Sequence, residues 1–198
     1  MARVARTWQV LLIGGASGSG KTSVSYRLAR HFDVGITEVD DFQIVLERMT
    51  NAELLPEIHF WRTHPDAVRS PANEIVAHLL AQSRVISTAL EAVIANHLES
   101  QMPVIFEGDF ILPALAAQTS FCGVPNDERV RAVVIDEDDE QQLIRNFLQR
   151  ESALQPERAR VSWLHGRWLK QQGEASGAAV IASRPWATLF ERVIRAIT

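Results

Sequence analysis

The chain has 198 residues, 46% of them hydrophobic and 22% charged, which excludes a disordered chain and predicts a single globular domain over residues 1–198. Its formal net charge of -4 gives no overall field that would attract nucleic acid or an anionic membrane, so neither is an expected partner. Cys122 is the only cysteine, which excludes a disulfide framework and makes the cytoplasm the simplest expected location, while the oligomeric state stays open.

The amino-terminal segment, residues 1–6, is basic, but the apolar run after it is short and leads directly into glycines. A secretory signal has a longer apolar region, so we do not expect one here. No later stretch approaches the roughly 20 consecutive apolar residues that a membrane-spanning helix needs.

The first predicted elements are a buried strand over 9–13 and a helix over 22–32, joined by a glycine-rich stretch. This stretch, Gly-Ala-Ser-Gly-Ser-Gly-Lys-Thr, matches the phosphate-binding loop pattern in full and stands between a strand and a helix, as that pattern requires. In such a loop the backbone N–H groups point at phosphate oxygens, and the helix start adds partial positive charge. We therefore predict a nucleotide site formed by Gly15, Ala16, Ser17, Gly18, Ser19, Gly20, Lys21, Thr22 and Ser23.

Two side chains of this loop have distinct expected roles. Lys21 should reach the β- and γ-phosphates of the nucleotide. The Thr22 hydroxyl is the expected Mg²⁺ ligand, because that hard ion prefers oxygen. A merely flexible glycine turn is the alternative, and the flanking strand and helix argue against it.

A second strand, predicted over 35–39, ends in Asp40 and Asp41 and leads into a helix over 42–49. Either carboxylate could lie across the crevice from the loop and orient or deprotonate an acceptor hydroxyl, which leaves open which one is the general base. Asp41 is also a candidate acceptor contact. The alternative is that these residues only cap the helix, since Asp is favoured at that position.

Residues 54–70 form a polar and aromatic segment before the longest predicted helix, which begins after Ser70-Pro71 and ends near Ser100. Within this segment we select Arg62 as a contact for an anionic acceptor, because a guanidinium offers a fork of donors. Simple packing of the segment against the core is the alternative.

A third strand, predicted over 104–106, brings Glu107 to the same edge of the sheet. We predict that Glu107 holds a magnesium-bound water, with an ordinary surface turn as the alternative. Asp109 is a further candidate acceptor contact, although it could instead cap the turn after Gly108.

A fourth strand, predicted over 130–135, runs into an acidic stretch, and two helical patterns over 141–155 and 158–172 follow. We predict that residues 138–172 form a lid that closes over the nucleotide and excludes water.

Four arginines of this lid could neutralise charge on the transferring phosphoryl group: Arg145, Arg150, Arg158 and Arg160. Arg145 and Arg150 are the preferred pair. The alternative is a solvated helix face on which these arginines form salt bridges.

The last predicted elements are a strand over 178–182 and a helix from Trp186 onward. Five short apolar strands separated by helices indicate parallel pairing with right-handed crossovers, and hence a three-layer α/β/α sandwich. In a parallel sheet of this kind the ligand site lies at the carboxyl ends of the strands.

Together these motifs resemble those of P-loop small-molecule kinases, the group that contains uridine kinases, 2-phosphoglycerate kinases and zeta-toxin-like proteins. The most particular stretches are Asp40-Asp41-Phe42 at a helix start, the run from Phe106 to Pro113 after the third strand, and Asp136-Glu137-Asp138 before the lid arginines. In combination they look most like 2-phosphoglycerate kinase. Where that family has an apolar residue and a histidine after the third strand, this chain has Asp109-Phe110.

The resemblance implies the fold of P-loop NTPases, ATP and Mg²⁺ as cofactors, and transfer of the γ-phosphoryl group to a hydroxyl of a small, possibly anionic metabolite. It also implies that Arg184, in the loop after the last strand, borders the adenine. Two alternatives stay open: a nucleotide-gated regulatory or binding protein without kinase activity, and a zeta-toxin-like nucleotide-sugar kinase. The choice between ATP and GTP and the identity of the acceptor also stay open.

Overall fold

A computed structural model of the chain describes residues 6–198, so most of the basic amino-terminal segment lies outside the described residues. Five parallel strands form the central sheet in the order β2-β3-β1-β6-β7. Their bounds are β1 Val10–Gly14, β2 Gly35–Glu38, β3 Val104–Gly108, β6 Val130–Asp136 and β7 Ala179–Ala182. The five predicted strands and their parallel pairing are confirmed.

β1 lies in the middle of the sheet, and its register determines which loops meet at the carboxyl edge. Gly14, its last residue, lies beside Gly108 of β3 and Val134 of β6. Glu38 at the end of β2 lies beside Glu107 of β3. The loop after β1 therefore leaves the sheet between the ends of its two neighbours, and the acids that end β2 and β3 are adjacent.

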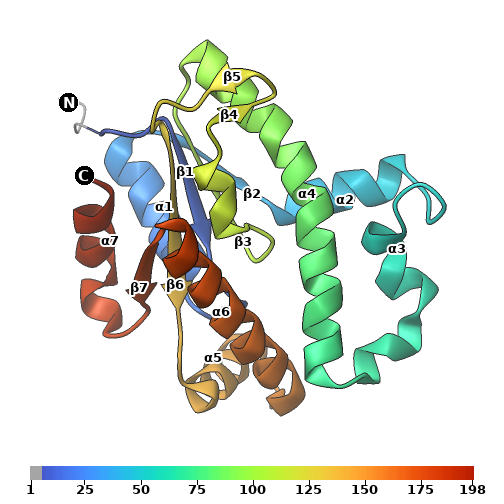
Figure 1. The fold of residues 1–198 in the computed structure, drawn as a ribbon. Helices are drawn as coiled ribbons and strands as arrows, with labels where there is room; N and C mark the ends of the chain where they lie inside the picture. Colours follow the sequence, from blue (N-terminus) through green and yellow to red (C-terminus); the bar gives the residue numbers. More distant parts are fainter. Residues whose placement is uncertain (1–5) are drawn as a thin grey trace.

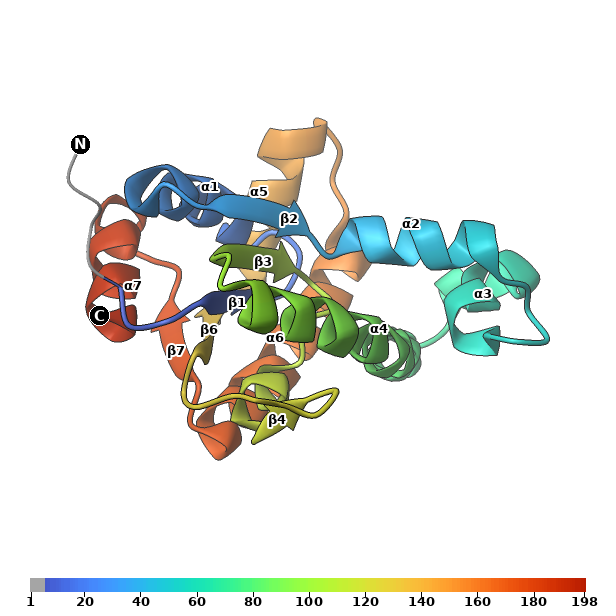
Figure 2. The ribbon, with the colours of Figure 1, turned by 90° about the horizontal axis from the view of Figure 1, so that it is seen from above.

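Helices cover both faces of the sheet, as Figures 1 and 2 show. Side chains of β1 alternate between the two faces. Leu11 and Ile13 pack against α1 (Lys21–Phe32) and α7 (Leu189–Ile197). Val10 and Leu12 lie in the core on the opposite face, which α4 (Ala72–Ser100) covers together with α6 (Pro156–Ser176). The predicted three-layer α/β/α architecture is confirmed.

The remaining helices lie near the carboxyl edge of the sheet. They are α2 (Asp40–Met49), α3 (Pro56–Thr63) and α5 (Glu140–Glu151). In Figures 1 and 2, α2 and α3 extend away from the sheet alongside α4. The predicted lid comprises α5 and most of α6. Helix α5 packs against α6, and α6 packs along α4 and the sheet.

Several elements were absent from the sequence prediction. The segment 54–70 contains α3 and a short 3-10 helix, Pro65–Arg69, and a proline opens each of them. A two-stranded hairpin pairs β4 (Ser120–Phe121) with β5 (Val124–Pro125), and further 3-10 turns cover Pro113–Ala117 and Trp186–Thr188. Every helix within residues 6–198 is too short or too polar to cross a membrane.

Candidate functional site

The glycine-rich loop leaves β1 and wraps into the first turn of α1. Gly20, directly before the helix, has a left-handed φ of 88°, and a Cβ at this position would overlap the ring of Trp186. A non-glycine residue would be strained there and would displace the tryptophan. The first-turn N–H groups of α1 have no partner within the helix, which leaves them available to an anion.

Helices α5 and α6 hold this loop from outside. The Asn146 side chain donates a hydrogen bond of 2.9 Å to the carbonyl of Gly18, and the Ser162 hydroxyl donates one of 2.8 Å to the carbonyl of Ser17. These bonds satisfy loop carbonyls that point outward. Inside the loop, the buried Ser19 hydroxyl has no hydrogen-bond partner among the described residues. The loop therefore has an unsatisfied polar interior, which fits an anionic ligand.

Lys21 lies at the centre of a group of acids. The residue is 8% exposed, and its side chain forms an ion pair with Asp109. Burial lowers the pKa of Lys21, but the negative charges of Asp109, Glu107 and Asp40 outweigh it, and the net effect raises the pKa above its ordinary value. The predicted phosphate-binding lysine is therefore charged and surrounded by the acids that the sequence analysis selected.

Glu107 is buried next to Thr22. The Thr22 hydroxyl donates to both carboxylate oxygens, at 3.1 Å and 3.2 Å. Burial raises the pKa of Glu107, and Lys21 and the Thr22 hydrogen bond lower it only in part. The two residues predicted to serve Mg²⁺ are thus in direct contact, and both offer the oxygen atoms that this ion prefers.

Asp40 and Asp41 form the first turn of α2. Val39 occupies the N-cap position, and no side chain caps the helix, so the structure does not support a capping role for these two residues. Asp40 is exposed, but neighbouring protein atoms remove part of the water around its carboxylate, and this desolvation raises its pKa. The charge of Asp109 raises the pKa of Asp40 further. Asp40 also approaches the end of β3, where a Cβ on Gly108 would lie 3.6 Å from its Oδ1. Asp40 therefore belongs to the acid group around Lys21.

The lid arginines divide into two sets. Arg145 pairs with Asp139 at 3.1 Å, and Arg150 pairs with Glu151 at 2.6 Å. Arg158 and Arg160 also form salt bridges, with Glu151 and Glu140, but in addition they line a cleft of about 840 Å³ between the start of α6 and the segment around Trp61 and Ile75. Neither Arg145 nor Arg150 lines this cleft.

Arg62 lies on α3 next to the residues that line the cleft. Its guanidinium contacts Nδ1 of the buried His59 at 3.0 Å, and it is not among the lining residues, whereas its neighbour Trp61 is. The Trp61 indole N–H donates to Gln82 of α4 at 2.9 Å. Arg62 is exposed and contacts His59 without lining the cleft, so its contact with an anionic acceptor stays a prediction, and Trp61 is the residue that faces the cleft.

Arg184 follows β7 and binds the acidic stretch after β6. It forms two close hydrogen bonds with Glu137, at 2.8 Å and 2.9 Å, and the Ser183 hydroxyl donates to the same carboxylate at 2.7 Å. Lys170 of α6 pairs with Asp136 at 3.0 Å. The acidic stretch therefore ties the loops after β6 and β7 and one turn of α6 together.

The sequence of the chain is similar to those of known proteins. An alignment of 203 positions, which covers 96% of this chain, shows 25% identity to the 2-phosphoglycerate kinase of Methanothermobacter thermautotrophicus. The chain resembles 2-phosphoglycerate kinases. It spans 65% of the length of that relative. No protein-family model matches the chain.

Solved structures show the same fold. A sugar kinase from Janibacter sp. matches with a TM-score of 0.53 and 16% identity over 96% of this chain and 94% of its own. Shikimate kinase from Aquifex aeolicus matches with a TM-score of 0.50 and 15% identity over 94% of this chain and 95% of its own. The predicted resemblance to P-loop kinases, in motifs and in fold, is confirmed.

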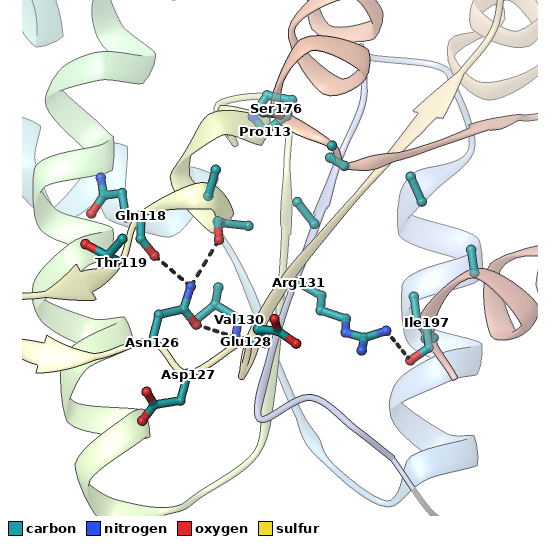
Figure 3. A pocket seen from close by; sticks show the side chains of 17 residues that line it. Pro113, Gln118, Thr119, Asn126, Asp127, Glu128, Val130, Arg131, Ser176 and Ile197 are labelled. Carbon is teal, nitrogen blue, oxygen red and sulfur yellow. Dashed lines mark hydrogen bonds between the residues drawn. The ribbon is translucent and has the colours of Figure 1, made fainter.

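A second cavity lies at the other end of the sheet, away from this kinase-like loop. It measures about 670 Å³ and is lined by the start of β6, the start of β7 and the end of α7. Figure 3 shows Asn126 holding the turn before β6 and Arg131 donating to the carbonyl of Ile197 at 3.4 Å. Because the strands are parallel, this cavity lies at their amino ends, opposite the glycine-rich loop.

One residue near the kinase-like site was missed by the sequence analysis. His165 of α6 is 2% exposed, and its Nε2 has no hydrogen-bond partner within residues 6–198. Burial lowers its pKa to about 4, and the charges that act on the ring are those of Asp109 and Lys21. A lone histidine in an Arg-rich helical pattern carries no local signal of this position.

Proposed function

We propose that the chain is a kinase that transfers the γ-phosphoryl group of ATP to a hydroxyl of a small metabolite. The observation that carries the proposal is the position of Lys21: a charged, buried lysine at the end of a glycine-rich loop, with carboxylates from β3 and α2 around it. A loop that only turned the chain would not need a buried cation. Kinase-like relatives and the matching fold support this assignment.

Each part of the loop has a role in holding the nucleotide. The N–H groups at the start of α1 and the Ser19 hydroxyl would bind phosphate oxygens, and Lys21 would bind the β- and γ-phosphates. Thr22 and Glu107 would hold Mg²⁺, directly or through water. When bound, this ion neutralises charge that builds up on the phosphate oxygens. No three His, Cys, Asp or Glu side chains of the described chain form a metal site by themselves, so the ion would depend on phosphate and water oxygens as well.

Asp40 is the better candidate for the general base. Its raised pKa makes it a stronger proton acceptor than an ordinary aspartate, and its place beside Gly108 puts it among the acids around Lys21. Asp41 and Asp109 would then contact the acceptor. Since positioning and electrostatics dominate phosphoryl transfer, this chain needs no covalent intermediate.

The cleft beside α6 favours a revised choice of lid arginines. Arg158 and Arg160 line it, and both guanidinium groups are about half exposed in their present salt bridges with Glu151 and Glu140. We propose that these two arginines, before Arg145 and Arg150, contact the acceptor or the transferring group. Arg184, which is held by Glu137, would border the base of the nucleotide.

An acceptor panel tests the function directly. The purified chain is incubated with ATP, Mg²⁺ and one hydroxyl compound at a time, beginning with 2-phosphoglycerate because of the relatives, and products are identified by mass spectrometry. We expect acceptor-dependent formation of ADP and of one phosphorylated product. Nucleotide binding without any product across a broad panel would instead favour the regulatory alternative.

The chain has a matched pair of variants for this assay, because Lys21 and Lys170 are its only lysines. Lys21→Met should lower turnover and nucleotide affinity by at least about 10-fold, as expected for losing a charge-assisted contact of about 1.5–3 kcal/mol. Lys170→Met loses its pair with Asp136 and some stability, but it should still bind the nucleotide. Equal nucleotide affinity in the two variants would contradict the role of Lys21.

A further inference from the structure

His165 lies on the face of α6 that packs against the glycine-rich loop. Three residues earlier, Ser162 donates to the carbonyl of Ser17, and one residue later, a Cβ on Gly166 would lie 3.4 Å from Cβ of Ala16. Residues three and four apart share one face of a helix, so Ser162, His165 and Gly166 are directed to the same side. His165 is therefore held close to the nucleotide site.

The ring of His165 is neutral and incompletely bonded. Its lowered pKa, caused first by burial, leaves it uncharged at neutral pH, with one N–H donor and one acceptor nitrogen. A buried polar group without a partner lowers stability, and native proteins rarely keep one without a reason. Nε2 is such a group.

Asp109 is the complementary group. Lys21 is its ion-pair partner, and no other side chain or backbone N–H of residues 6–198 donates a hydrogen bond to it. In the proposed function Lys21 turns toward the phosphates, which would leave this half-buried carboxylate without its cation. The carboxylate would then need a donor, and His165 is a neighbouring group whose Nε2 lacks a partner.

We propose that His165 is a positioning residue for Asp109, donating a hydrogen bond from Nε2 to the Asp109 carboxylate once the nucleotide has drawn Lys21 to its phosphates. This inference rests on the proposed function. It gives Asp109 one partner in the free protein and another in the nucleotide complex. His165 would occupy one carboxylate oxygen of Asp109, so the other oxygen would remain free to orient an acceptor hydroxyl.

Nuclear magnetic resonance of the histidine side chains tests the exchange of partners. The ¹⁵N-labelled chain is recorded alone and with Mg²⁺ and a non-hydrolysable ATP analogue, with the His165 signals assigned from His165→Gln. We expect the nucleotide to fix the Nε2–H tautomer of His165 and to slow exchange of that proton. In Asp109→Ala the same addition should leave the ring unchanged.

Calorimetry on the same samples distinguishes a failure of this inference from a failure of the proposed function. If the nucleotide binds but the ring nitrogens and the Nε2 proton of His165 do not respond, the inference is overturned while the proposed function stands. If no nucleotide binds to folded protein, the proposed function fails and the inference fails with it.

A kinetic pair gives an independent readout. His165→Gln keeps a side-chain N–H donor, whereas His165→Leu keeps a similar volume without one. We expect the Leu variant to lose about 10-fold or more in kcat/KM for the acceptor, the effect of one hydrogen bond to a charged group, with nucleotide affinity nearly unchanged. The Gln variant should recover most of that loss. Equal losses in both variants would contradict the positioning role.

Discussion

Asp109→Asn should tighten nucleotide binding while it weakens phosphoryl transfer. In the free protein Asp109 holds Lys21, the residue that we expect to bind the phosphates. A nucleotide must therefore compete with Asp109 for the lysine. A charge-assisted pair contributes about 1.5–3 kcal/mol. Because Glu107 and Asp40 also attract Lys21 and remain in the variant, we expect the lower end of that range, a gain of about 10-fold in affinity.

The assay is calorimetric titration with Mg²⁺ and a non-hydrolysable ATP analogue at one fixed salt concentration, beside a turnover measurement. Asp66→Asn is the matched control, because it removes the same charge from a side chain that is 96% exposed. The only ion pair of Asp66 within residues 6–198 is a long one, 3.9 Å from its Oδ1 to Nη1 of Arg69. The control should bind and turn over as the unmodified chain does. Unchanged or weaker nucleotide binding by Asp109→Asn would refute the competition between carboxylate and phosphate.

Three further perturbations follow from the same contacts. Glu107→Gln should abolish Mg²⁺-dependent transfer and yet raise the melting temperature. Burial raises the pKa of Glu107, so ionising this carboxyl in the folded protein costs stability once the pH exceeds the ordinary pKa of a glutamate. The gain in melting temperature should therefore be larger at pH 8 than at pH 4. Ser162→Ala removes the bond to the Ser17 carbonyl, which at about 1 kcal/mol should lower the melting temperature by roughly 2–4 °C, measurable by calorimetry. Arg158→Ala should lower kcat/KM for the acceptor more than Arg145→Ala, because only the first lines the cleft beside α6; equal kinetic losses would contradict that choice.

The sheet and the loop could be predicted from the sequence because their signals are local. Every residue after Gln9 up to Ile13 is apolar, which is typical of a strand covered on both faces. The glycine pattern follows directly. Glu107 and Asp109 could be selected for the same reason, since parallel strands bring their carboxyl ends to one edge. In the structure these acids surround Lys21.

The segment 54–70 shows which features could not be predicted from local sequence patterns. The sequence offers several polar and aromatic residues between 54 and 70, but only the formation of α3 determines which of them face the cleft. In the structure Arg62 contacts His59, while Trp61 lines the cleft and bonds to Gln82 of α4. Pro56 at the start of α3 was the missed signal, because proline is favoured in the first turn of a helix.

The acidic stretch after β6 could be placed but not interpreted, because its partner comes from another strand. Glu137 is buried, and a buried carboxylate needs charged or hydrogen-bonding partners. Those partners are Ser183 and Arg184, which reach it only because β7 lies next to β6 in the sheet. The same dependence on neighbouring elements applies to His165, whose proposed role follows from the packing of α6 on the glycine-rich loop. Residues that act across two elements are thus the ones that periodicity and motif spacing do not reveal.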